Sequence, residues 1–310
     1  VYKRQARRRP QPRGPPRDPP TFDALPSGLY TIEAVPTTTA EKELLRRRAT
    51  TAMAASALVA DVAATLEPTG SPVMPIKGAL LQHWLYDDPA DRPLTDVDLL
   101  VPEAGLGPAI RALAAAGYRL TEHTSVGGAV LETRFGLMLD LHGRLFGSAR
   151  YLLTTDALFA RSVANRDLFG AAVRLPSALD VYAHLIGKAG SDHIHEDARD
   201  RLGEIRRLGH WLGLPAEAIA EHLRVSGMRR VARYVLRLVG RSTDDPLSLR
   251  IVDALPPDPM GGALAQCADA ILARVSPDSR LGAVVAHSLN DTLLLGARSG
   301  AAALVVRRPR

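Results

Sequence analysis

The sequence predicts an α+β protein in which a mixed β-sheet flanked by helices is followed by an all-α domain. Two observations lead to this prediction. Short runs of strand character alternate with helical segments as far as residue 175, and after Pro176 only helical patterns follow. We therefore expect a first domain over residues 28–175 and a helical domain over residues 176–310.

The first expected element is a long helix over residues 40–66, because this run lacks Gly and Pro and is rich in Ala, Leu and Arg. Threonines at 37–39 can cap its start, and Pro68 and Gly70 end it. The next elements are expected to be a strand at 73–76, a helix at 79–86, a strand at 96–101 and a helix at 107–116. They are followed by a hairpin or pair of neighbouring strands at 129–134 and 137–142, and by a last strand at 171–175.

The second domain is expected to consist of six helices, over 177–189, 197–212, 216–225, 228–239, 262–274 and 279–296. Its arginine pairs, such as Arg229-Arg230, are typical of solvated helix faces. The single cysteine, Cys267, excludes an internal disulfide and a Cys-rich zinc site, and a buried inert thiol is its ordinary role.

The net positive charge of the chain comes from its two ends. Residues 1–20 hold seven basic residues and one acid, which equals the whole net charge of +6, whereas residues 21–306 come to −3. A basic protein would ordinarily suggest a polyanionic partner, but the body of this chain gives no such indication and argues against long nucleic acid. Residues 1–27, rich in Arg and Pro and opening on Val, have a composition typical of disorder or of read-through from non-coding sequence.

The apolar runs of the chain do not predict a membrane protein. No apolar stretch of 7–15 residues follows the basic start, so a secretory signal is not expected. Uninterrupted apolar runs such as 303–306 are far shorter than the roughly 20 residues that cross a bilayer. We therefore expect a cytoplasmic protein that does not interact with a membrane.

Two carboxylates on one strand are the first indication of chemistry. In the run DVDLLV, side chains alternate between faces, so Asp96 and Asp98 point the same way. Two acids side by side among apolar neighbours repel each other unless a cation lies between them, and Mg²⁺ is the usual ion. Two solvated acids at the start of a strand are the alternative.

A second strand, in LMLDLHGRL, places Asp140 and His142 on one face. If it neighbours the first strand, three acids can hold two Mg²⁺ ions for phosphoryl chemistry. Between an earlier strand and helix, Gly78 lets the backbone approach a phosphate and Lys77 adds a positive charge. Arg92 can reach the same triphosphate, or it is a solvated loop arginine.

Together these motifs resemble the nucleotidyltransferase superfamily. More closely, KGALLQHWLYDDPADRPLTDVDLLV and LMLDLHGRL resemble its uncharacterised family often labelled type 5, over about residues 40–240. The resemblance implies a nucleotidyltransferase palm over residues 28–175. It also implies transfer of a nucleoside monophosphate from a nucleoside triphosphate such as ATP, with Mg²⁺, to a hydroxyl or amine acceptor and release of pyrophosphate.

Carried onto this chain, the resemblance makes Asp96, Asp98 and Asp140 both metal ligands and catalytic residues. Nucleotide contacts are assigned to the following five residues: Lys77, Gly78, Arg92, His142 and Lys188. Lys188 is included because it lies one helical turn after His184, on a helix expected to face the nucleotide or acceptor. A small molecule or a protein side chain is the expected acceptor, with a tRNA end left open.

Alternative functions also fit the sequence. The superfamily usually carries Gly-Ser or Gly-Gly at the phosphate turn, whereas here Ala79 follows Lys77-Gly78. A regulatory module that binds nucleotide without turnover is therefore one alternative, and an interaction protein with a nucleic-acid-binding basic tail is another. The run HIHED at 193–197 is either a second metal site, a set of acceptor contacts, or the cap of the next helix.

Overall fold

The computed structural model describes residues 38–124, 127–146, 150–191 and 199–258, together with isolated positions between 263 and 291. The described residues from Glu43 onward belong to one compact unit. The expected tail at 1–27, the run HIHED and most of the last two expected helices lie outside the described residues. The domain boundary near residue 175 stays a prediction.

The first described element is, as predicted, the long helix α1 (Thr39–Leu66). The hydroxyl of Thr38 accepts from the backbone N–H of Glu41, whose carboxylate accepts from the N–H of Thr38, and this reciprocal pair caps the helix. Together with the following 3₁₀ turn, the segment Thr39–Thr69 is long and apolar enough to cross a membrane. Its second half instead buries a stripe of residues in the core: Ala52, Ala55, Leu58, Val59, Val62, Ala63 and Leu66.

The sheet has five strands in the order β1-β2-β5-β4-β3. Only β2 and β5 run parallel, and the other pairs are antiparallel, so the sheet is mixed as predicted. The strands are β1 (Met74–Pro75), β2 (Asp96–Leu100), β3 (Arg119–Thr124), β4 (Gly128–Glu132) and β5 (Met138–His142). Helices α2 (Lys77–Leu85) and α3 (Leu106–Ala115) follow β1 and β2.

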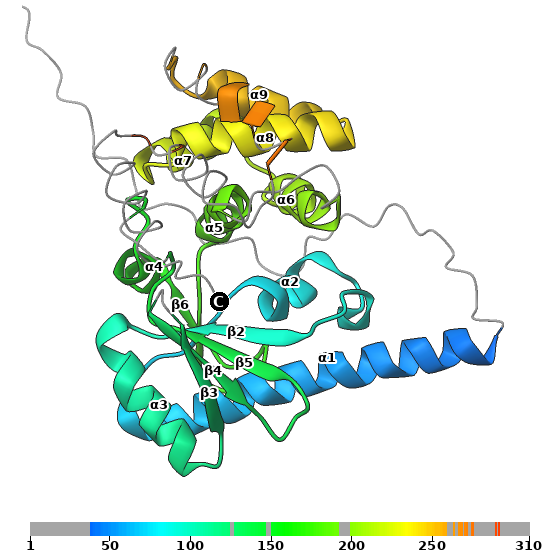
Figure 1. Ribbon diagram of the computed structural model, residues 1–310, viewed down its shortest axis with the longest axis vertical. Helices are drawn as coiled ribbons and strands as arrows, with labels where there is room; N and C mark the ends of the chain where they lie inside the picture. Colours follow the sequence, from blue (N-terminus) through cyan, green and yellow to red (C-terminus); the bar gives the residue numbers. More distant parts are fainter. Residues whose placement is uncertain are drawn as a thin grey trace, which may run out of the picture. The chain divides into compact units, whose positions relative to one another are not determined.

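Beyond the sheet lie a short helix, a two-stranded ribbon and five further helices. They are α4 (Thr155–Arg161), β6 (Val163–Asn165), β7 (Val173–Leu175), α5 (Ala178–Ser191), α6 (Arg199–Trp211), α7 (Ala216–Val225), α8 (Arg229–Thr243) and α9 (Pro246–Ala254). In Figure 1, α5 to α9 lie together above the sheet, whereas α1 runs below it. The four helices predicted between residues 177 and 239 are thus confirmed, whereas the described positions 289 and 291 of the helix expected over 279–296 are a turn and a bend. Elements β3, α4, β6 and α9 are additional to the prediction.

Each face of the central strands packs into a different core. Alternation along β2 and β5 sends Val97, Leu99, Leu139 and Leu141 to one face, where they are fully buried with α1 and α3. Leu100, of opposite parity, belongs to the core formed by α2 and the helices α5 to α9. The acids predicted for the site share the face of Leu100, and they therefore lie on the side of the helical region.

Two predictions about side-chain burial are wrong. Cys267 is exposed, because it lies in a short helical stretch whose neighbouring residue Ala268 is the one that faces the core. Arg230, expected on a solvated helix face, is 6% exposed and donates from Nε to Asp258 at 2.8 Å. A carboxylate distant in sequence makes this burial tolerable, since a buried charge requires a partner.

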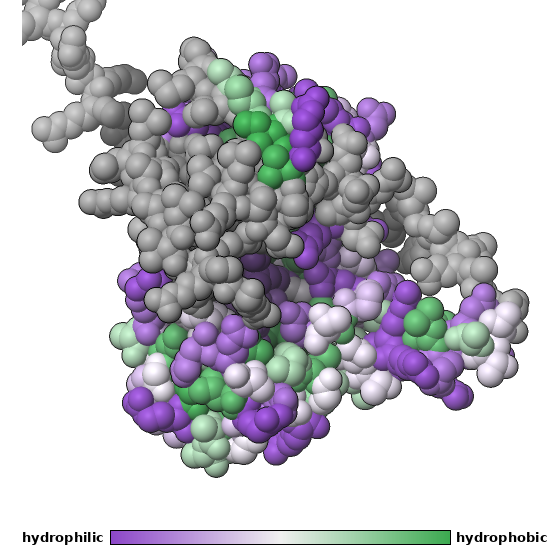
Figure 2. Space-filling model, in the orientation of Figure 1, coloured by the Kyte–Doolittle hydropathy of each residue, from purple (hydrophilic) through white to green (hydrophobic). Residues whose placement is uncertain are grey.

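On the visible face, hydrophilic and apolar residues are interspersed over the N-terminal half of α1, at the right of Figure 2.

Candidate active site

The parallel pairing of β2 with β5 brings the two predicted motifs together. In the register Asp98 lies beside Asp140, Asp96 beside Met138, and Leu100 beside His142. Because alternate residues share a face, the two aspartates of β2 and the Asp140 and His142 of β5 are all on the side facing away from α1. The prediction that the second strand neighbours the first is confirmed.

Asp98 is the most heavily contacted of these groups. Its Oδ1 lies 2.5 Å from the ammonium of Lys77 and 2.9 Å from Nε2 of His142, and its side chain is 8% exposed. Burial raises the pKa of this carboxyl, but the hydrogen bond from His142 and the charge of Lys77 outweigh burial and lower the pKa to about 2. Asp98 is therefore ionised throughout the neutral pH range.

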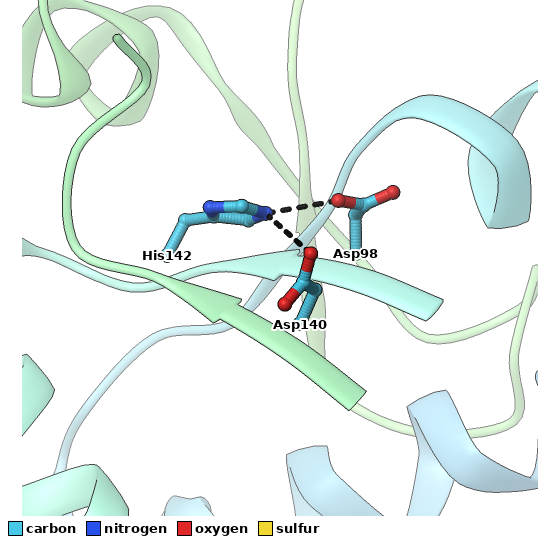
Figure 3. A group of neighbouring side chains, drawn as sticks. All are labelled: Asp98, Asp140 and His142. Carbon is cyan, nitrogen blue, oxygen red and sulfur yellow. Dashed lines mark hydrogen bonds and ion pairs between the residues drawn. The ribbon is translucent and has the colours of Figure 1, made fainter. Parts of the chain in front are cut away.

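Asp140 lies opposite and is the more open carboxylate, with 28% of its side chain exposed. Its Oδ2 is 4.0 Å from Nε2 of His142, which thus faces both acids (Figure 3). Burial raises the pKa of Asp140, and the charges of Asp98 and Asp96 add to the increase, against the opposing effects of His142 and Lys77. A carboxylate with a raised pKa is the better proton acceptor of the two.

Asp96 stands beside this group and not within it. Potential ligand atoms of Asp98, Asp140 and His142 all lie within 4.8 Å of one another, and among the described residues this is the grouping suited to a metal ion. Asp96 accepts a hydrogen bond from the Thr95 hydroxyl at 3.2 Å and acts on Asp140 through its charge. The compact set is thus two acids and a histidine, where the sequence suggested three acids.

Lys77 is positioned by an unusual backbone. It is the first residue of α2 and has a φ of +51°, a left-handed conformation that a residue with a Cβ seldom adopts. The preceding residue, Ile76, donates its backbone N–H to the carbonyl of Asp98 at 3.1 Å, which joins this turn to β2. The strained turn delivers the ammonium to the acids, and such strain is concentrated at functional sites.

Gly78 has a packing role in the structure. A Cβ at this position would lie 2.5 Å from NH1 of Arg92 and 2.5 Å from Cδ2 of Leu94, so both side chains would have to shift to accommodate it. The guanidinium of Arg92 therefore rests directly against the start of α2. The predicted approach of a phosphate to Gly78 stays a prediction, with Arg92 already next to that backbone.

Arg92 is held by a residue that the sequence analysis missed. Its Nε and NH2 both donate to the carboxylate of Glu204 on α6, the NH2 bond measuring 3.2 Å. Tyr86 donates its hydroxyl to the same carboxylate at 3.2 Å. Glu204 lies 112 residues beyond Arg92, on a helix with no motif, so only the fold makes it recognisable.

The fifth predicted nucleotide residue, Lys188, is half-buried on α5. One turn earlier, His184 is 3% exposed and meets the edge of the Phe146 ring at 5.5 Å between centroids. Burial, reinforced by the charge of Lys77, lowers the pKa of His184 to about 3, and Lys188 contributes in the same direction. The helix thus brings a neutral imidazole and a cation into the electrostatic surroundings of the site.

The residues present fit a divalent cation. Two carboxylates converge with an imidazole nitrogen, and oxygen and imidazole donors are the usual protein ligands of divalent ions. The ammonium on Asp98 already neutralises part of the negative charge, as a cation would.

The comparisons with known proteins agree with the fold and the motifs. Residues 25–243 match the profile of a family described as uncharacterised nucleotidyltransferases. No curated protein matches the chain significantly. The match spans the sheet, the site on β2 and β5, and the helices α5 to α8 that carry Lys188 and Glu204. The α+β architecture, its two facing acids and this match together show that the chain belongs to the family of uncharacterised nucleotidyltransferases.

Proposed function

We propose that this protein transfers a nucleoside monophosphate from a nucleoside triphosphate to a hydroxyl or amine acceptor, with release of pyrophosphate. The observation that carries the proposal is the register pairing of Asp98 with Asp140, two carboxylates held on adjacent parallel strands beside Lys77 and His142. Family membership supports nucleotidyl transfer in general.

Each residue of the site has a role in this proposal. Asp140, partly exposed and with a raised pKa, accepts the proton of the acceptor, which makes the acceptor a stronger nucleophile. Lys77 and Arg92 bind phosphate oxygens at the start of α2. A divalent ion bound by Asp98 and Asp140, for which the family resemblance implies Mg²⁺, would neutralise charge on the phosphates together with a second ion near Asp96.

The acceptor is proposed to be a small molecule or a protein side chain. The body of the chain, with its balance of −3 over residues 21–306, offers little attraction to a long polyanion. A cytoplasmic location and the absence of a membrane partner belong to the same proposal.

The test uses Asp98→Asn, with the exposed loop variant Asp87→Asn as the matched control. Purified protein is incubated with labelled nucleoside triphosphates, divalent metal and a metabolite extract, and pyrophosphate release and mass gain of the acceptor are measured. We expect Asp98→Asn to abolish both signals and Asp87→Asn to keep them. Full transfer by Asp98→Asn would show that the site is wrongly assigned.

One observation favours a second candidate, a nucleotide-binding regulatory module that has lost turnover. The ammonium of Lys77 contacts the oxygen of Asp98 that would otherwise face a metal. Calorimetric titration with a nucleoside triphosphate separates the two functions, because binding without any pyrophosphate release identifies the module.

A further inference from the structure

We propose that His142 is a direct metal ligand and that the site consequently takes Mn²⁺ in preference to Mg²⁺. The inference rests on the proposed function, since it names the ion that serves the same site. It makes His142 a third metal ligand beside Asp98 and Asp140, whereas the family resemblance assigned His142 to nucleotide contact.

The geometry around Nε2 carries the first step. This atom lies 2.9 Å from Oδ1 of Asp98 and 4.0 Å from Oδ2 of Asp140. Ligands at about 2.1 Å from an octahedral ion lie about 3.0 Å apart when adjacent and about 4.2 Å apart when opposite. Both separations fall in the range of two ligands on one ion, so an ion would replace the hydrogen bond between Nε2 and Oδ1 once the ring carries its proton on Nδ1 and leaves the Nε2 lone pair free.

The backbone explains why the imidazole is there. His142 is the last residue of β5 and lies two positions after Asp140, hence on the same face. Its side chain is only 17% exposed, and Nε2 is directed at the acids, as Figure 3 shows. An aspartate or asparagine at this position would be too short to place a donor at the same point.

Donor chemistry carries the second step. Mg²⁺ is bound almost entirely by oxygen, whereas imidazole suits the first-row transition metals. Two carboxylates and one imidazole form a mixed set that favours a first-row transition metal over Mg²⁺, and Mn²⁺ is the member of that row that shares the carboxylate preference of Mg²⁺. Zn²⁺ also accepts such a set, and it is therefore included as a competitor below.

The ammonium of Lys77 allows the proposed metal site to be tested in a second, independent way. Its ammonium and the Nε2 of His142 contact the same oxygen of Asp98, and an ion entering between the three ligands meets that ammonium. Like charges at this separation repel each other. Replacement by the uncharged Lys77→Met should therefore tighten Mn²⁺ binding by tenfold or more.

The experiment is pulsed electron paramagnetic resonance of Mn²⁺ bound to the full chain, alone and with pyrophosphate, a nitrogen-free co-ligand. We expect ¹⁴N modulation that changes when the protein is labelled with ¹⁵N-histidine, and Mn²⁺ affinity at least tenfold above that of Mg²⁺. His142→Asn and His142→Gln should lose the modulation and bind Mn²⁺ at least tenfold more weakly, since even outer-shell changes cost about 10–100-fold. The control His123→Asn, on the exposed strand β3, should change neither.

The outcomes separate the inference from the function on which it rests. Mn²⁺ bound without histidine modulation, in a manner lost in Asp98→Asn, would overturn the role of His142 and leave the metal site intact. The preference for Mn²⁺ would be overturned by equal affinities for Mg²⁺ and Mn²⁺. It would also be overturned if the site bound Zn²⁺ and did not bind Mn²⁺. Absence of any ion binding, with circular dichroism showing folded protein, would overturn both the inference and the metal-assisted function.

Discussion

Gly78 gives the sharpest test of how the start of α2 is built. In a helix, Ala is ordinarily more favourable than Gly by about 1 kcal/mol. At this position, however, the added methyl group would stand 2.5 Å from both the Arg92 guanidinium and the Leu94 side chain. Gly78→Ala is therefore expected to destabilise the protein, opposite in sign to the helix preference.

The magnitude follows from three contributions. Forcing one methyl group into packed surroundings costs about 1–3 kcal/mol, and the helix preference offsets up to about 1 kcal/mol of that. Displacement of Arg92 also strains its paired hydrogen bonds to Glu204, where the two side chains are only 20% and 12% exposed. We expect a net loss of about 2 kcal/mol, which corresponds to a fall in melting temperature of about 5 °C for a unit of this size.

The assay is thermal and urea unfolding of Gly78→Ala beside Gly203→Ala. Gly203 lies within α6, and no atom lies within 4 Å of the point that an added methyl group would occupy, so its replacement should stabilise the protein by up to about 1 kcal/mol. Nucleotide affinity should also fall in Gly78→Ala, because Arg92 moves, and stay unchanged in Gly203→Ala. Two variants that shift stability equally in the same direction would refute the contact of Arg92 with Gly78.

Two further predictions concern the helical region. Because the folded pKa of His184 is about 3 and the unfolded value is about 6.5, only the unfolded state gains this proton as the pH falls below 6.5. Between pH 7 and pH 5, the free energy of unfolding of the unmodified protein should thus fall by about 2 kcal/mol more than that of His184→Phe. Urea unfolding measures both pH profiles, and equal profiles would contradict the prediction. Asp180 is fully buried and accepts two hydrogen bonds from Arg161, at 2.9 and 2.8 Å. Asp180→Asn should cost about 2 kcal/mol in urea unfolding, whereas Glu221→Gln, at the exposed pair with Arg224, should change stability by less than about 0.5 kcal/mol; equal effects would contradict the burial argument.

Local sequence patterns predicted the central elements well, because their signals are local. The run DVDLLV has the alternation expected of a strand, and the structure places its two acids on the face of β2 opposite Val97 and Leu99. The Gly- and Pro-free run after the threonines became α1, with the Thr38 and Glu41 cap readable from residue types alone.

Other elements were not predicted. Strand β3 (Arg119–Thr124) is an edge strand that is almost wholly exposed, so it shows no apolar alternation and its place is set by pairing with β4. Helix α9 does carry a readable start, since Asp245 caps it and accepts from the N–H of Ser248 at 3.0 Å, with Pro246 following. The sequence analysis missed this helix although its signal is local.

The candidate site divides in the same manner. Asp98, Asp140 and His142 could be selected from strand patterns, because neighbouring strands bring residues of equal parity together. Glu204 could not, since it is recognised by its contacts with Arg92 and Tyr86, which lie 112 and 118 residues earlier in the chain. The pairing of Lys77 with Asp98 likewise depends on the left-handed backbone conformation of Lys77, which residue types alone do not predict.

Helix α2 packs into both hydrophobic cores, so the predicted domains depend on each other for their stability. Ala79 packs with the sheet and α1, whereas its neighbours Leu80 and Leu81 pack with the helices that follow Pro176. A chain cut at Pro176 would expose one side of α2 to water, and the turn that carries Lys77 would lose its support. The carboxylates of the candidate site and the helices beyond them should accordingly be expressed and purified as one unit.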